Sequence, residues 1–203
     1  MRSGRSLWCL LLALFLLAGI RPADAQGSLM RPVVDPKGRF TIDFPADWHV
    51  LKPNGGMIAV LGVATARKGP NPASVNVVVE DLPGTLSPEH YAGLSERMLR
   101  AVFHDYTPVQ EGSATIGGQA AYYRYYTWQT NTGVILYQLQ VYFTVDRRGF
   151  VITGSTLNDP QHTRIYVPVI TQIIESFRPA GRTYVPDRRY AFLQLVNGGH
   201  WPR

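Results

Sequence analysis

The chain has 203 residues, of which 45% are hydrophobic and 17% are charged, and its formal net charge is +6. This apolar content excludes a disordered chain, and the single cysteine excludes a fold held together by internal disulfides. The length predicts one domain with short additional segments. Basic residues occur singly or in pairs, without the clustering typical of nucleic-acid binding, so we expect no nucleic-acid partner.

The first 25 residues have the pattern of a secretory signal peptide. Arg2 and Arg5 precede an uncharged apolar run over residues 7–20. As a helix, this run spans only about 21 Å, short of the roughly 30 Å hydrocarbon core, which disfavours a membrane anchor. Small residues before the predicted cut place cleavage between Ala25 and Gln26. We therefore expect an exported soluble protein, periplasmic or secreted, with no transmembrane segment after cleavage.

The rest of the chain divides into three predicted parts. Residues 26–38 contain Pro32 and Pro36, which predict a flexible lead-in. Residues 39–179 hold the regular hydrophobic patterns of one domain. Residues 180–203 mix basic and aromatic side chains with Gly and Pro, and predict a weakly ordered tail in which Tyr190–Val196 forms at most one short strand.

Two helices are expected in the domain. Ser87 and Pro88 are typical of a helix start, because serine caps free N–H groups and proline fits the first turn. The apolar stripe of this helix, which ends near His104, consists of Tyr91, Leu94, Met98, Val102 and Leu99. A second helix begins at Asn158-Asp159-Pro160, and Pro168 inside it predicts a kink or a broken first turn.

The remaining patterns predict an antiparallel sheet. Short turns bearing glycine separate apolar or alternating runs, and such links join antiparallel neighbours. The second face of the long run over residues 134–145 is partly apolar, so both faces of the sheet should be at least partly covered. We predict an α+β fold with an antiparallel sheet of about six or seven strands flanked by helices. The predicted strands are Arg39–Phe44, Met57–Ala66, Val75–Val79, Val109–Ile116, Gln119–Gln129, Val134–Val145 and Phe150–Leu157.

Three segments of the chain form a recognisable set: the strand, proline and tryptophan of Phe40–Trp48, the glycine hairpin of Ile116–Ala120, and the helix end at Ile173–Phe177. Together they resemble the PsbP-like α/β/α sandwich superfamily, which includes the DcrB-like bacterial proteins. The resemblance covers Arg39–Pro179 and implies the sandwich fold. It also implies an accessory or binding protein rather than an enzyme, but no residue of the chain matches a functional motif of the superfamily.

Motifs for catalysis or metal binding are not found in the sequence. No two histidines have the i, i+4 spacing of a helical metal site, and neither HExxH nor GxSxG occurs. We expect no cofactor, no metal and no enzyme activity. A catalytic group assembled from distant Ser, His and Asp side chains stays open as an alternative, which would make the protein a hydrolase.

One strand carries the candidate binding residues. Alternation along residues 121–128 places Tyr122, Arg124, Tyr126 and Trp128 on one face. Aromatic rings around an arginine are suited to stacking a ligand or anchoring a partner. The same pattern also fits a strand that packs its tyrosines beneath a helix, because tyrosine favours strands.

Three functions are therefore compatible with the sequence. The first is a non-catalytic accessory protein that binds a partner protein in the cell envelope. The second is a protein that binds a small apolar or amphipathic ligand in a cleft between the sheet and a helix. The third is the hydrolase.

Overall fold

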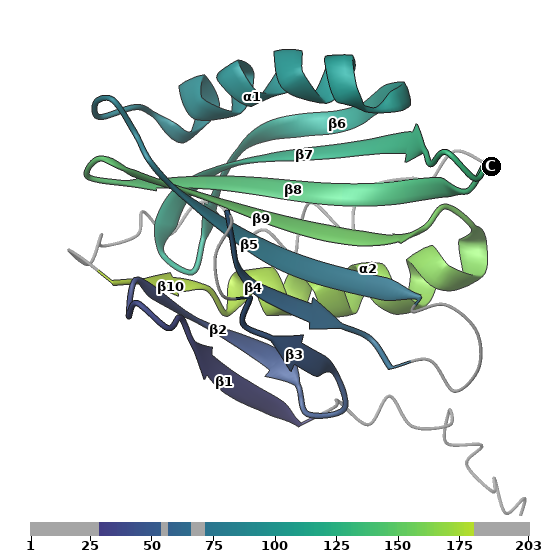
Figure 1. Ribbon diagram of the computed structural model, residues 1–203, viewed down its shortest axis with the longest axis horizontal. Coiled ribbons are helices and arrows are strands. Elements are labelled where there is room, and N and C mark those ends of the chain that lie inside the picture. The colour runs from purple at the N-terminus through teal and green to yellow at the C-terminus, as the bar shows by residue number, and fades with distance from the viewer. Residues whose placement is uncertain (1–28, 54–56, 66–71, 181–203) are drawn as a thin grey trace, which may run out of the picture.

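The computed structural model describes residues 29–53, 57–65 and 72–180 (Figure 1). The predicted signal peptide, its cleavage site at Ala25 and Gln26, and residues 181–203 of the predicted tail lie outside the described residues. The described chain forms a seven-stranded antiparallel sheet, a three-stranded sheet and two helices. The predicted α+β fold class is confirmed.

The seven-stranded sheet contains six of the seven predicted strands, and every neighbouring pair in it is antiparallel. The seventh, Arg39–Phe44, lies in the smaller sheet instead. A two-residue turn at Gly117 and Gly118, both with positive φ, joins the strand over residues 104–116 to the strand over residues 119–129. The strand that precedes this turn begins at His104, directly after the preceding helix and its C-cap residue, five residues before the predicted start at Val109. The order is β3 (His49–Leu51), β4 (Ile58–Val63), β5 (Ala73–Asp81), β9 (Arg148–Leu157), β8 (Ile135–Val145), β7 (Gln119–Gln129) and β6 (His104–Ile116).

The smaller sheet was not expected from the sequence. Its central strand β2 (Phe40–Pro45) pairs with β1 (Met30–Val34) on one side and with β10 (Arg178–Pro179) on the other. Strand β1 lies within the segment predicted as a flexible lead-in. Pairing with β2 explains this difference, because a short strand containing Pro32 is stable at a sheet edge and carries little signal of its own.

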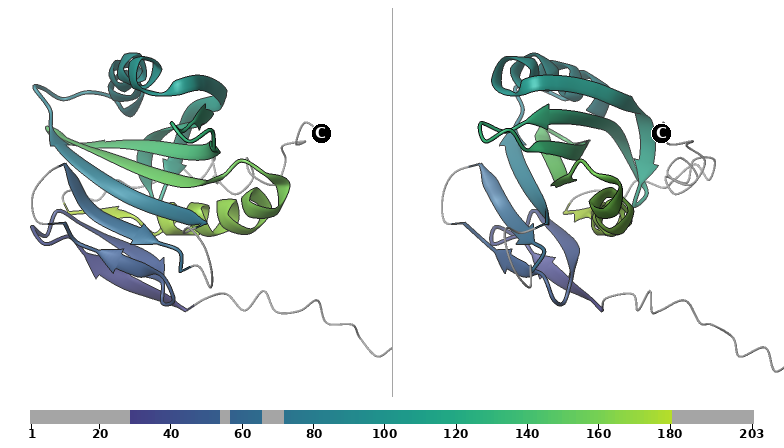
Figure 2. Two further views of the ribbon diagram at one scale, coloured as in Figure 1. Left: turned by 45° about the vertical axis from the view of Figure 1, so that its right-hand side comes forward. Right: turned by 90° about the vertical axis from the view of Figure 1, so that its right-hand side faces the viewer.

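The main core lies between the large sheet, the small sheet and helix α2 (Pro160–Glu175). The large sheet curves around α2, which lies on the face opposite helix α1 (Figure 2). Phe40, Ile42 and Phe44 of β2 are buried in this core, and Phe177 contacts Phe40, Phe143 and Phe150. The start of α2 is capped as predicted, since Asp159 accepts hydrogen bonds from the N–H groups of Gln161 and His162 at 3.0 Å. The helix continues through Pro168.

Helix α1 (Pro88–Val102) lies on the other face, over the end of the sheet formed by β6, β7 and β8 (Figures 1 and 2). Ser87 caps it by accepting a hydrogen bond from the His90 N–H at 3.1 Å. The prediction that one apolar stripe of α1 faces the core is wrong. Tyr91 is buried, but Leu94, Met98 and Val102 are exposed. The inward side of the helix is instead formed by Tyr91, Ala92, Ser95, Glu96 and Leu99.

Candidate functional site

The four candidate residues of β7 lie beneath α1. Alternation along the strand places them on one face, whereas Tyr123 and Tyr125 pack into the main core on the other. Tyr126 has no exposed surface and Arg124 is 2% exposed, while the two outer residues of the row are half-buried. The row Tyr122, Arg124, Tyr126 and Trp128 therefore supports the helix, and α1 covers its centre.

Arg124 connects the helix to the outer strand of the sheet. Its Nε donates to Glu111 Oε2 at 2.6 Å, and its Nη2 donates to Glu96 Oε2 at 3.3 Å. Its Nη1 donates to the carbonyl oxygen of Ala92 at 3.4 Å. Burial acts to lower the pKa of Arg124, but the hydrogen bond to Glu111 and the charge interactions with Glu111, Tyr142 and Tyr106 together outweigh burial, and the pKa lies above its usual value. The guanidinium therefore stays charged and fixes the rotation of α1.

Aromatic rings fill the space between the end of α1 and the sheet. Phe103 stacks on Trp128 with a centroid distance of 4.3 Å, and Tyr106 lies 5.0 Å from Tyr126. Burial raises the pKa of the Tyr126 hydroxyl, which therefore stays protonated at neutral pH. Tyr142 on β8 is also fully buried here and packs against Tyr91. Side chains thus occupy the region where the sequence allowed a ligand cleft.

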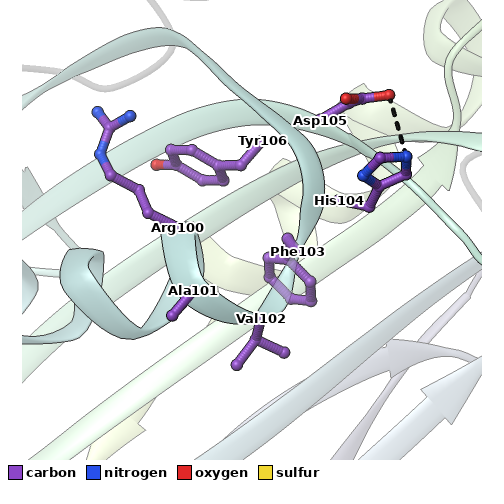
Figure 3. Close-up of a pocket in the computed structure, with 7 residues that line it drawn as sticks. All are labelled: Arg100, Ala101, Val102, Phe103, His104, Asp105 and Tyr106. Atoms are coloured by element: carbon purple, nitrogen blue, oxygen red, sulfur yellow. Dashed lines mark ion pairs between the residues drawn. The ribbon is translucent and has the colours of Figure 1, made fainter.

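A shallow surface pocket of about 510 Å³ lies where α1 turns into β6 (Figure 3). The Arg100 guanidinium lies 5.1 Å from the centroid of the Tyr106 ring on one side of this pocket. On the other side, His104 and Asp105 form an exposed ion pair with 3.6 Å between Nε2 and Oδ2. Asp105 has a φ of 52°, a conformation that aspartate tolerates better than most residues.

The sequence identified Leu94, Met98 and Val102 as part of an apolar stripe but not that they are exposed, and we define these three residues as the apolar flank of α1. These side chains are 45%, 69% and 69% exposed. Glu96 and Arg100 contact Arg124 and Tyr106 on the β6 side of the helix. At 100° per residue, the apolar flank projects from the opposite side, toward β9 and β5.

Two further apolar side chains on this side of the large sheet are exposed, on strands that β5 and β9 separate from the strands beneath α1. Leu51 on β3 and Ile58 on β4 are 42% and 37% exposed. Cross-strand partners show that both share the face of the sheet on which α1 lies. The first row of partners crosses from β7 to β3 through Arg124, Gln140, Thr153, Asn76, Leu61 and Leu51. The second row crosses from β7 to β4 through Tyr122, Tyr142, Val151, Val78 and Ile58.

Within the described ranges, no group of three or more His, Cys, Asp or Glu side chains is placed to hold a metal ion. Neither described helix is long and apolar enough to cross a membrane.

Comparison with known proteins identifies the fold. No family model matches the sequence, and no curated protein matches it. Among solved structures, cyanobacterial PsbP (CyanoP) from Synechocystis aligns with a TM-score of 0.57 over 75% of this chain and 93% of that chain, at 14% identity. The chain has the PsbP-like fold. The resemblance predicted from Phe40–Trp48, Ile116–Ala120 and Ile173–Phe177 is thereby confirmed at the level of the fold.

Two further structures share this PsbP-like fold. LpqN, involved in cell envelope biogenesis of Mycobacterium tuberculosis, aligns with a TM-score of 0.54 at 19% identity, over 73% of this chain and 89% of LpqN. The Saccharomyces cerevisiae Ran-binding protein Mog1p aligns with a TM-score of 0.55 at 10% identity, over 75% of this chain and 96% of Mog1p. At these identities the similarity establishes a common fold and no common activity.

Proposed function

We propose that this protein is an exported, non-catalytic accessory protein that binds a partner protein in the cell envelope. The observation that carries the proposal is the exposed apolar flank of α1. Three large apolar side chains at i, i+4 and i+8 stay in water on a helix whose inward side includes Ala92, Ser95 and Glu96. A contiguous exposed apolar surface of this kind is typical of a protein interaction site.

The arrangement beneath α1 supports this proposal. Arg124 and the aromatic rings hold the helix on the sheet, so the apolar flank is a rigid surface rather than a loop that must become ordered. A preorganised surface loses less conformational entropy on binding. In this proposal, Tyr122, Arg124, Tyr126 and Trp128 position the binding surface, and only the half-buried Tyr122 and Trp128 reach its edges.

The fold comparisons are compatible with a binding role. One protein of this fold is described as Ran-binding and another as involved in cell envelope biogenesis. The predicted signal peptide supports the cellular location in the proposal, because an exported chain meets envelope proteins.

Affinity capture from an envelope fraction of the source organism tests the proposal. The bait is the chain after signal removal, either unchanged or with Met98→Glu. A glutamate in the middle of the apolar flank should reduce recovery of the specific partner at least tenfold, because the charge must lose water when the flank is covered.

Ile165→Glu is the matched control. Ile165 is an exposed apolar residue on α2, 47% accessible, and lies outside the proposed surface. The proposal expects this variant to recover the partner as the unchanged chain does. Equal recovery with Met98→Glu and the unchanged chain would contradict it.

A further inference from the structure

Strand β6 is the outer strand of the large sheet, and none of the described strands pairs with its second edge (Figure 1). Its 13 residues extend at most roughly 44 Å at about 3.4 Å per residue, and its pairing with β7 is regular over Gln110–Ile116, after register shifts between His104 and Thr107 and between Pro108 and Gln110. In an outer antiparallel strand, alternate residues direct their N–H and C=O groups away from the neighbouring strand. Such an edge readily accepts another strand, so proteins usually cover or interrupt it.

The chain passes the end of this edge when it leaves α2. A Cβ atom on Gly117 would lie 2.5 Å from Arg178 Nη1 and 3.0 Å from the carbonyl oxygen of Phe177. The turn that ends β6 therefore contacts the segment that follows α2. The described structure ends two residues later at Ala180, whose N–H donates to the carbonyl oxygen of Arg39 at 2.7 Å. Twenty-three residues, 181–203, follow.

The composition of residues 181–203 suits a strand on this edge. Residues 190–196 (YAFLQLV) contain no charge, glycine or proline, and aromatic and β-branched residues favour strands. Arg188 and Arg189 precede this segment, and Asp105 is an exposed acidic residue on β6, whereas the Glu111 carboxylate of this strand already pairs with Arg124.

The intervening chain is long enough to reach β6. Ten residues lead from Ala180 to Tyr190, and at about 3.3–3.6 Å per residue they span at most roughly 33–36 Å. Because the chain starts beside the Ile116 end of β6, a segment that follows the free edge runs antiparallel to β6. Residues 190–196 would then cover roughly 24 Å of it.

We propose that residues 190–196 of the same molecule add to the free edge of β6 as an eighth antiparallel strand. A short connection gives a segment of the same molecule an effective concentration in the millimolar range, which favours it over a second copy at ordinary protein concentrations. This site is separate from the proposed partner surface, because the apolar flank of α1 faces away from β6.

Hydrogen exchange of the β6 backbone amides tests the inference. Three forms of the full chain after signal removal are compared: the unchanged chain, a double variant F192P/L193P, and a control G198P/G199P. Adjacent residues in a strand direct their N–H groups to opposite sides, so the double substitution removes one donor that faces β6 in either register. The amides of β6 that do not bond to β7 should exchange at least tenfold faster in F192P/L193P than in the other two forms.

The amides of α2 report whether the fold is intact, and they should be equally protected in all three forms. Protection of β6 should also be independent of protein concentration between about 5 and 500 µM, as expected for pairing within one molecule. Equal exchange of β6 in all three forms would overturn the proposal. Protection that rises with concentration would also overturn it and would instead indicate a second copy as the occupant.

Discussion

At the scale of single residues, Arg124 determines how α1 sits on the sheet. We expect Arg124→Met to lower the free energy of unfolding by about 2 kcal/mol, because it removes the only cation that the structure places between Glu96 and Glu111. The loss should be smaller than the 3–5 kcal/mol typical of a fully buried ion pair, since both carboxylates are partly exposed. Urea denaturation at pH 7 measures it.

Arg100→Met is the control for Arg124, because Arg100 pairs with the same Glu96 on the exposed side of α1. An exposed pair at this spacing should contribute less than about 0.5 kcal/mol. Equal losses in the two variants would show that Arg124 has no special role in positioning α1.

Asp35 provides a pH-dependent test at the same scale. Its fully buried carboxylate accepts hydrogen bonds from Arg39 Nε at 2.7 Å and Nη2 at 2.9 Å, and from the N–H of Lys37 at 3.2 Å. Burial acts to raise its pKa, but the hydrogen bonds and charge of Arg39 together with the hydrogen bond from the Lys37 N–H outweigh burial, so the pKa lies below its usual value. A lowered pKa stabilises the fold above the unfolded-state value of about 3.9, and this stabilisation is lost as the pH falls through the folded-state value.

Asp35→Asn should therefore lower the free energy of unfolding by about 1–3 kcal/mol at pH 7. The difference from the unchanged protein should shrink as the pH falls below about 4. Urea denaturation at pH 7 and at pH 3 provides the comparison. A difference that stays constant across this range would exclude a stabilising Asp35 carboxylate.

At the scale of elements, the contact between α2 and β9 depends on a missing side chain. A Cβ atom on Gly154 would lie 2.1 Å from Ile170 Cγ2. We expect Gly154→Ala to destabilise the protein by about 1–3 kcal/mol, because the helix must shift away from the sheet. Gly93→Ala on α1 is the matched control, since no heavy atom lies within 4 Å of the added carbon.

The control substitution Gly93→Ala should raise stability by about 0.5–1 kcal/mol, because alanine favours an exposed helix interior. Thermal unfolding followed by circular dichroism gives both values. A melting temperature of Gly154→Ala at or above that of the unchanged protein would contradict the close packing of α2 on β9.

Elements with strong local signals could be predicted from the sequence. Ser87 and Asp159 mark both helix starts, and Gly117-Gly118 marks a two-residue turn of the meander. Strands β1, β3 and β10 could not be predicted, because they are short and depend on partners far along the chain. Strand β10, for example, pairs with Thr41 and Phe40, more than 130 residues earlier.

The candidate site shows the same division between local and distant information. The alternation along β7 correctly placed Tyr122, Arg124, Tyr126 and Trp128 on one face. That α1 covers this face could not be inferred from the sequence, because the rotation of α1 depends on the contact between Arg124 and Glu96, which are 28 residues apart. The apolar stripe of α1 was visible in the sequence, but spacing alone cannot tell whether such a stripe faces a core or a partner.

At the scale of the whole molecule, the large sheet is covered unequally on its two faces. Helix α2 and the small sheet enclose one face in the main core, whereas α1 lies over β6–β8 on the other and forms a smaller cluster there that includes Val151 of β9 (Figure 2). The apolar flank of α1 forms the surface that we propose for a partner. A protein that uses this surface needs a rigid scaffold, which the core supplies.

Site-specific photocrosslinking in the native envelope tests this central claim most directly. A photoreactive amino acid replaces Met98 in one form of the protein and Ile165 in another, and adducts are identified by mass spectrometry. The account predicts a discrete protein adduct from position 98 that is not obtained from position 165. The same adducts from both positions, or no protein adduct from position 98, would contradict it.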